Sequence, residues 1–185
     1  MHGASRPTSH KLSTRALQPP PVQPHFRPER KVRISVTLRI GYAAGAFDLF
    51  HVGHLNILKH AKSQCDYLIA GVVSDKMLLL TKGVGAVIPL AERLEIVRHI
   101  NYVDEAREEV LPDKLDTWRE LRFHVFFKGD DWRGTAKGVR LEREFAAVGV
   151  EVVYFPYTMH TSSTQLRRVL DVISANGGQV SETQS

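Results

Sequence analysis

The stretch Gly45–His54, G-A-F-D-L-F-H-V-G-H, stands between an apolar run and a helical pattern. The run before it, residues 36–42 (V-T-L-R-I-G-Y), predicts a β-strand. The apolar residues after it have the three- and four-residue spacing of one helix face: Leu55, Leu58, Ala61 and Cys65. His51 and His54 therefore lie in a strand-to-helix turn. A helix N-terminus presents unpaired N–H groups and a partial positive charge, so this turn suits a phosphate group.

Strands and helices alternate outward from this turn. The continuous apolar run Tyr67–Val73 predicts a strand that is buried on both faces. Further strands are expected at about 108–111, 125–127 and 151–155, and helices at about 90–100, 115–121, 139–148 and 163–173. The alternation predicts an α/β fold in a single domain. We expect a Rossmann-like, doubly wound parallel sheet with helices on both faces.

Unusual segments follow the predicted strands. In a doubly wound parallel sheet, ligands bind outside the carboxyl ends of the strands. The segments expected at that edge are Gly45–His54, Ser74–Asp75, Lys128–Trp132 and Tyr157–Thr164. Their convergence predicts a single binding site there.

Composition limits the class of protein. The chain has 185 residues, a formal net charge of +5 and one cysteine, Cys65. Residues 1–33 contain seven basic residues and one acidic residue, so the remainder is nearly neutral and no nucleic-acid partner is expected. That Pro/Ser-rich basic segment and residues 176–185 are predicted to be disordered, which leaves 34–175 as the domain. A lone cysteine and the lack of a long apolar run predict a cytoplasmic protein with no stable membrane insertion.

The two histidines allow three interpretations. A zinc site needs more ligands than His51 and His54 supply, and His60 falls on a different helical phase, so no metal site is expected. Histidines that only pack are the second interpretation. In the third, both imidazoles donate hydrogen bonds to phosphoryl oxygens whose charge rises during a transfer reaction.

The motif resembles the G-x-F-D-x-x-H-x-G-H signature of the cytidylyltransferase-like nucleotidyltransferases. Four more segments follow in the order of that family: Ala91–Val97, Tyr102–Glu105, Lys128–Trp132 and Thr161–Thr164. The resemblance covers roughly Arg39–Val169. On these motifs the chain is identified as a member of the family, closest to the glycerol-3-phosphate and phosphoethanolamine cytidylyltransferases.

The resemblance implies an activity. Members of this kind transfer CMP from CTP to a phosphoalcohol, with Mg²⁺ accompanying CTP, and release a CDP-alcohol and pyrophosphate for phospholipid or cell-wall precursor synthesis. A homodimer is also implied. Gly129–Trp132 (G-D-D-W) resembles the CTP enzymes, whereas the sugar-phosphate adenylyltransferases tend toward G-G-D-W. An adenylyltransferase that uses ATP on a sugar phosphate or flavin-type acceptor is the alternative.

The resemblance also implies roles for individual residues. The catalytic set would be His51, His54 and Lys82, with Lys82 as a mobile cation in the loop after the second strand. Contacts to the nucleotide are implied for Ala46, Phe47, Gly53, Lys128, Gly129, Asp130, Thr161, Ser162, Ser163 and Thr164. Contacts to the acceptor or a phosphate are implied for Asp48, Asp75 and Arg93. Asp48 is expected to orient the turn, while a helix cap remains open for Asp75 and a surface ion pair for Arg93.

Four positions depart from the family pattern. Ala46 replaces a threonine, His160 a glycine, and Asn101 and Tyr157 two arginines. The missing arginines put glycerol 3-phosphate in doubt as the acceptor, unless Arg98, Arg167 or Arg168 supplies the positive charge. A member that only binds nucleotide as a sensor, and nucleic-acid binding through the basic segment 1–33, are the non-enzyme alternatives.

Overall fold

The computed structural model describes residues 38–156 and 161–177. Five strands form one parallel sheet in the order β3-β2-β1-β4-β5. Their bounds are β1 Ile40–Gly45, β2 Tyr67–Val73, β3 Glu105–Glu109, β4 Val125–Gly129 and β5 Glu151–Phe155. The helices are α1 Val52–Lys62, α2 Asp75–Lys82, α3 Leu90–Arg98, α4 Lys114–Leu121, α5 Ala136–Ala146 and α6 Ser163–Gly177, with a 3₁₀ turn, η1, at Asp130–Trp132. The predicted parallel α/β fold is confirmed.

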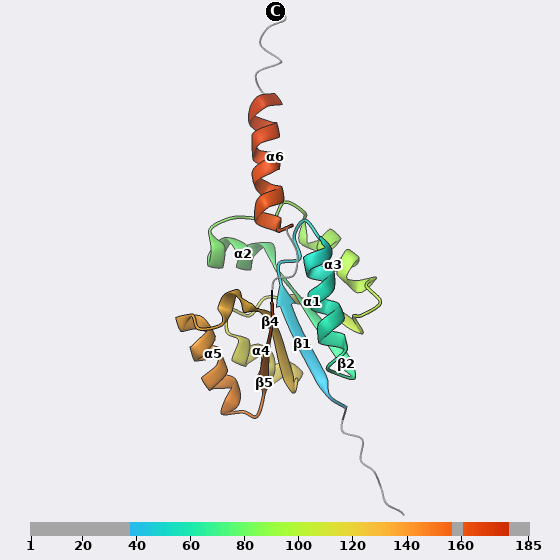
Figure 1. The fold of residues 1–185 in the computed structure, drawn as a ribbon, viewed down its shortest axis with the longest axis vertical. Helices are drawn as coiled ribbons and strands as arrows, with labels where there is room; N and C mark the ends of the chain where they lie inside the picture. Colours follow the sequence, from blue (N-terminus) through green and yellow to red (C-terminus); the bar gives the residue numbers. More distant parts are fainter. Residues whose placement is uncertain (1–37, 157–160, 178–185) are drawn as a thin grey trace, which may run out of the picture. The chain divides into compact units, whose positions relative to one another are not determined.

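Both faces of the sheet are covered by helices. Figure 1 shows α1 and α3 on one side of β1 and α4 and α5 on the other. On one face, Leu58 of α1 and Val97 of α3 pack against apolar residues of the strands, including Phe127. On the other face, Phe145 of α5 packs with Phe126 of β4 in a second cluster to which α4 also contributes. The strands are apolar on both faces because each face contacts helices, which explains the continuous apolar run of β2.

The connections place a crevice between β1 and β4. From β1 the chain moves outward to β2 and β3, and it then returns to β4 on the other side of β1 before reaching β5. β1 and β4 pair directly, with Gly41 opposite Val125 and Ala43 opposite Phe127. Neighbouring strands whose connections leave in opposite directions open a crevice at their carboxyl ends. The turn that carries His51 and His54 follows β1 into this crevice.

Several predicted bounds need correction. β1 begins at Ile40 and continues to Gly45, and α1 ends at Lys62, so Cys65 lies beyond it. The helix α2 is absent from the prediction, which treats Lys82 as a loop residue. Ser74 caps α2 by accepting a bond from the N–H of Met77 at 3.2 Å, and Gly83 ends it in the left-handed conformation. Lys82 is therefore the last residue of a helix.

The predicted ends of the chain are tested only in part. α6 runs to Gly177, so Asn176 and Gly177 are helical although the sequence predicts disorder from residue 176. The disorder predicted for 1–33 and 178–185 lies outside the described residues. None of the helices within 38–156 and 161–177 is long and apolar enough to cross a membrane.

A buried polar cluster lies at the carboxyl end of β3. The hydroxyl of Tyr42 donates to the carboxylate of Glu109, and Thr117 Oγ1 donates to the same carboxylate at 3.1 Å. Burial, followed by the nearby charge of Glu109, raises the pKa of Tyr42, so the phenol remains a donor. A Cβ atom at Gly71 would lie 2.0 Å from the Tyr42 hydroxyl oxygen, so only glycine leaves room for this ring.

Tyr42→Phe is expected to lower the free energy of unfolding by about 1–3 kcal/mol, because the buried carboxylate of Glu109 loses a donor. Tyr67→Phe is a matched control. Tyr67 also lies in a strand and donates to a glutamate of β3, Glu105, but at 3.4 Å and beside a partly exposed carboxylate. Tyr67→Phe should lower the free energy of unfolding by less than about 0.5 kcal/mol. Urea denaturation of both variants measures the difference, and equal losses would contradict this account.

Candidate functional site

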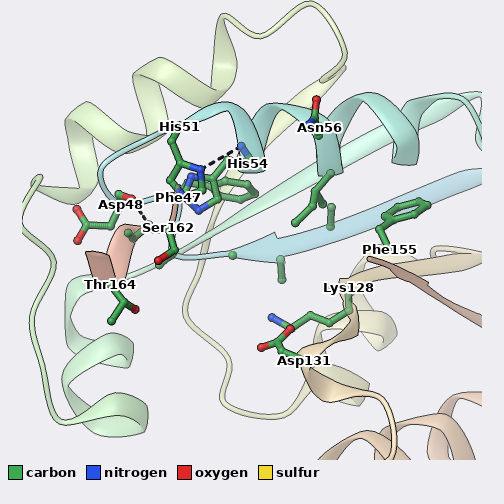
Figure 2. A pocket seen from close by; sticks show the side chains of 18 of the residues that line it. Phe47, Asp48, His51, His54, Asn56, Lys128, Asp131, Phe155, Ser162 and Thr164 are labelled. Carbon is green, nitrogen blue, oxygen red and sulfur yellow. Dashed lines mark hydrogen bonds between the residues drawn. The ribbon is translucent and has the colours of Figure 1, made fainter. Parts of the chain in front are cut away.

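A cavity of about 520 Å³ opens at the carboxyl ends of β1 and β4. Segments from β1, α1, α2, β4, η1 and the start of α6 line it (Figure 2). Most of the predicted site residues line this cavity: Ala46, Phe47, Asp48, His51, Gly53, His54, Lys82, Lys128, Gly129, Thr161, Ser162, Ser163 and Thr164. The structure therefore brings together side chains that lie more than a hundred positions apart in the sequence.

The turn between β1 and α1 has an unusual backbone. Phe47 and Leu49 both adopt left-handed conformations, with φ of 50° and 47°. Such conformations cost residues other than glycine about 1–2 kcal/mol each, so the surrounding contacts must hold the turn. The ring of Phe47 is buried and lies 5.5 Å from that of His54, edge to face. The strained turn thus places an aromatic ring beneath the second histidine.

His51 is the N-cap of α1. Its Nδ1 accepts a hydrogen bond from the N–H of Gly53 at 3.0 Å. Burial lowers the pKa of His51, so the neutral ring is favoured, and because Nδ1 accepts, the proton resides on Nε2. A Cβ atom at position 53 would lie 2.7 Å from Cε1 of His51. Gly53 is therefore required for the packing of this ring against the helix start.

His54 is held among aromatic rings. Its ring centroid lies 4.1 Å from that of His51 and 5.4 Å from that of Phe50. Burial, followed by the proximity of His51, lowers the pKa of His54 to about 4. Its buried Nδ1 has no hydrogen-bond partner among the described residues. Figure 2 shows the two rings side by side at the start of α1. The lowered pKa values favour neutral rings at pH 7, so neither ring is a fixed cation and each has one N–H group to donate.

Asp48 is fully engaged by neighbouring donors. Its carboxylate accepts bonds from the N–H groups of Val87 at 3.0 Å and Ile88 at 2.9 Å, and pairs with Arg167 at 2.5 Å. Burial alone would raise the pKa of Asp48, but the two backbone bonds and the guanidinium outweigh it, so the pKa lies below its ordinary value. These contacts suit the predicted role of orienting the turn and leave little of the carboxylate for a proton transfer.

The Ser/Thr segment begins α6. Ser162 Oγ accepts a bond from the N–H of Gln165 at 3.2 Å, and the Gln165 side chain accepts from the N–H of Ser162 at 3.1 Å. This reciprocal pair is a capping box. The remaining first-turn N–H groups of a helix lack intrahelical partners and favour an anion. Ser162 and Thr164 border the same cavity as the histidines, so two helix starts line it (Figure 2).

The segment after β4 supplies a cation and a carboxylate. Lys128 Nζ lies 4.7 Å from the ring centroid of Trp132. Burial lowers the pKa of Lys128 to about 8, with Asp131 opposing this shift and Lys82 adding to it. Asp131 lines the cavity, whereas the predicted residue Asp130 does not. Of the two aspartates in η1, the second therefore lies at the site (Figure 2).

Arg93 and Asp75 do not line the cavity, and their predicted contact with the acceptor or a phosphate stays a prediction. Arg93 is fully buried and pairs with Asp75 at 2.5 Å. It also donates to the backbone carbonyl oxygens of Ile88 at 2.8 Å and Val73 at 2.9 Å, and to that of Ala46. Its guanidinium is occupied by protein atoms, so Arg93 supports the walls of the cavity.

The departures from the family pattern divide into two groups. Asn101 precedes β3, at the amino ends of the strands, and therefore lies at the edge opposite the cavity. An arginine at that position would add no charge to the cavity of its own chain. In the same motif, Asp104 accepts from the N–H of Leu68 at 2.7 Å and pairs with Lys62 at 2.6 Å. Tyr157 and His160 lie outside the described residues.

Several residues that line the cavity are absent from the predicted site residues: Asn56, Ile57, His60, Asp131, Trp132 and Phe155. Arg167, considered as a source of positive charge, also lines the cavity. Asn56 and His60 lie one turn apart on α1, beyond His54. Asn56 and His60 follow Gly53 by three and seven positions, so helical spacing from Gly53 could have identified them. Arg98, considered as a source of charge, pairs with Glu95 at 3.0 Å and does not line the cavity.

Comparison with known proteins identifies the family of this chain. A family model described as cytidylyltransferase-like matches residues 42–169. A glycerol-3-phosphate cytidylyltransferase of Bacillus subtilis is 34% identical over 130 residues, which cover 66% of this chain and 90% of that protein. An FAD synthase of Pyrococcus horikoshii is 28% identical over 151 residues, covering 79% and 95%. The solved structure of a lipopolysaccharide core biosynthesis protein from Thermoplasma volcanium has a TM-score of 0.56 at 22% identity, covering 68% of this chain and all of that one, and shows a likeness of fold.

The low pKa of His54 predicts a specific loss of stability in acid. The ordinary pKa of 6.5 falls to about 4 in the folded protein, so between these pH values the unfolded chain binds more protons. The free energy of unfolding should therefore decrease as the pH falls from about 6.5 to about 4, with His54 contributing up to about 3 kcal/mol. Urea denaturation at pH 7 and 4.5 measures the decrease. The decrease in the free energy of unfolding should be smaller in His54→Gln than in the wild type. An equal decrease in that variant would contradict the low pKa of His54.

Proposed function

The chain belongs to the cytidylyltransferase-like family of nucleotidyltransferases, and on this basis we propose that it transfers CMP from CTP to a phosphoalcohol. Glycerol 3-phosphate and phosphoethanolamine represent the acceptor class, and a CDP-alcohol and pyrophosphate are the products. One observation carries the proposal. Two neutral imidazoles, His51 and His54, stand at the start of α1 and border the same cavity as the start of α6.

The proposed reaction is a direct displacement at phosphorus. An oxygen of the acceptor phosphate forms a bond to the α-phosphorus of CTP, and the bond from that phosphorus to the bridging oxygen of the β-phosphate breaks. The electron pair leaves with pyrophosphate. The acceptor phosphate is already ionised at pH 7, so no general base is needed, and the engagement of Asp48 by Arg167 and two backbone N–H groups fits this. The protein aligns the reactants and stabilises charge.

The side chains divide this work by charge. His51 donates from Nε2, since its Nδ1 is occupied by Gly53. Neutral donors strengthen their bonds as charge develops on the phosphoryl oxygens, so they favour the transition state over the bound substrate. Lys82 and Lys128 line the cavity and attract the triphosphate. Lys82 adds to the lowering of the pKa of Lys128, so the two positive charges repel each other and a bound phosphate group would offset that repulsion.

Mg²⁺ enters the proposal with the triphosphate. The carboxylates that line the cavity are Asp48 and Asp131 within the described part of the chain. The carboxylate of Asp48 is engaged by Arg167 and by backbone N–H groups, which leaves Asp131 to hold a metal–nucleotide complex. One protein carboxylate suits Mg²⁺, which in nucleotide sites is bound largely by phosphate oxygens and water. The ion supplies neutralisation of the triphosphate charge.

Two nucleoside triphosphates, CTP and ATP, are candidates for the nucleotide substrate. CTP is favoured by Gly129–Trp132, G-D-D-W, and by the similarity to a glycerol-3-phosphate cytidylyltransferase over 90% of that protein. ATP is favoured by the similarity to an FAD synthase, which extends over more of this chain. An adenylyltransferase therefore remains the alternative function. It would use the same histidines and the same displacement at the α-phosphorus.

Incubation of the purified protein with Mg²⁺, each nucleoside triphosphate and a panel of phosphoalcohols tests the proposal. We expect pyrophosphate release with CTP, at a kcat/KM at least about 10-fold above that for ATP, and with glycerol 3-phosphate or phosphoethanolamine as acceptor. A preference for ATP with a flavin or sugar phosphate would establish the alternative. Binding of CTP without pyrophosphate release for any acceptor would identify a nucleotide sensor.

His51→Ala tests the role of the first imidazole. We expect kcat to fall roughly 30–150-fold, with a smaller change in KM. This loss corresponds to about 2–3 kcal/mol of transition-state stabilisation. His99→Ala is the control, because His99 caps the far end of α3, is exposed and does not line the cavity. Steady-state pyrophosphate release measures both variants. A near-normal kcat for His51→Ala would refute the assigned role.

A further inference from the structure

Arg167 of α6 contacts two segments that lie far from it in the sequence. Its Nη2 pairs with Asp48 Oδ2 at 2.5 Å, and its Nη1 donates to the carbonyl oxygen of Gly85 at 2.7 Å. One turn earlier in the same helix, Ser163 Oγ donates to the backbone carbonyl oxygen of Asp48 at 2.8 Å. The opening turn of α6 is therefore fixed to the histidine turn by bonds to both the side chain and the backbone of Asp48.

The same carboxylate also fixes the loop 83–89. Val87 and Ile88 donate their backbone N–H groups to Asp48 at 3.0 and 2.9 Å. This loop follows directly on Lys82, the last residue of α2, so its position determines where that cation lies. Three cavity walls thus depend on one cluster of bonds: the histidine turn, the end of α2 with its loop, and the start of α6.

We propose that Arg167 is a positioning residue that assembles the phosphate-binding site from these three segments before a nucleotide binds. Its consequence for catalysis rests on the proposed function. Arg167 lines the cavity, but its guanidinium is committed to Asp48 and Gly85. It therefore acts through these partners and not by contact with a phosphate.

The charges in this cluster are suited to such a role. The side chain of Asp48 is 4% exposed and that of Arg167 is 30% exposed, so the pair is far less screened than a surface ion pair. Loss of the guanidinium would leave a buried carboxylate with backbone donors alone, which weakens the contact that holds α6. A lysine restores the charge but not the two-pronged geometry that bonds a carboxylate and a carbonyl together.

The chain offers a matched control one residue away. Arg168 has the same charge and lies in the same helix, but it is exposed and does not line the cavity. Arg167→Gln and Arg168→Gln therefore remove the same charge from the same element. Only the first variant removes the contacts to Asp48 and Gly85.

Steady-state kinetics test the proposal. We expect Arg167→Gln to raise KM for CTP about 10-fold, with kcat reduced less, because the walls that bind the triphosphate are no longer fixed in place. Arg167→Lys should recover part of the loss, and Arg168→Gln should stay within about 2-fold of the wild type. A fall in kcat alone would show contact with the transition state and overturn the positioning role, as would an Arg167→Gln variant indistinguishable from Arg168→Gln.

A double-mutant cycle separates action through Asp48 from independent action. If Arg167 acts through Asp48, the variant that combines Arg167→Gln with Asp48→Asn should be little worse than the poorer single variant. Fully additive losses would overturn the proposal.

Amide hydrogen exchange, measured without any substrate, tests the positioning role of Arg167 independently of the proposed function. In Arg167→Gln, the amides of Val87 and Ile88 and those of the first turn of α6 should exchange faster, while those of β2 stay unchanged. Unchanged exchange at Val87 and Ile88 would overturn the proposal whether or not CTP is the substrate. A wild-type protein that fails to use CTP would refute the proposed function and leave this measurement valid.

Discussion

One fully buried guanidinium, that of Arg93, holds the carboxyl edge of the sheet together. It donates to the carbonyl oxygens that end β1 and β2, at Ala46 and Val73, and to that of Ile88 in the loop before α3. Its charge is balanced by Asp75. A buried charge persists only where neighbouring groups satisfy it, so the strand ends and the loop must keep their relative positions. The turn after β1 and the loop before α3, which both contribute to the cavity, start from these fixed points.

Arg93 and Asp48 form complementary anchors. Arg93 binds backbone carbonyl oxygens, whereas Asp48 binds backbone N–H groups, and both engage the loop that ends at Pro89 through Ile88. Where the chain leaves a strand or forms a loop, its backbone N–H and carbonyl groups have no partner in the sheet. Asp48 and Arg93 supply those partners. The two histidines remain neutral because burial lowers the pKa of each, while the strong charges lie on Arg93 and Asp48. The site thus separates the charges that shape it from the donors that would contact a phosphate.

Local patterns predicted much of the fold. The strands Tyr67–Val73 and Glu151–Phe155 have the bounds that their apolar runs indicate, and the alternation of elements predicted the parallel sheet. The convergence of the unusual segments followed from the same sheet, since carboxyl ends share an edge. The helix α2 escaped detection because Leu79 and Leu80 are exposed, which obscures an amphipathic pattern.

Partners across the fold could not be predicted in this way. Arg93 looks like an ordinary surface charge in a helix, and only the packing of α3 on the sheet buries it. Asp48 and Arg167 are separated by 119 positions, so no local pattern links them. The family resemblance located Arg93 and Asp75, but it could not indicate whether these side chains face a ligand or one another.

The left-handed residues Phe47 and Leu49 have a consequence for the order of folding. Their backbone conformation is unfavourable in an isolated turn, so the local chain does not adopt it unaided. The contacts that compensate come from Arg93, from Val87 and Ile88, and from Arg167, all of which join the turn late along the chain. Pairs so distant close slowly, because chain entropy is lost before they form. The histidine turn is thus the first motif of the domain to be synthesised, and it is expected to be among the last to reach its native shape.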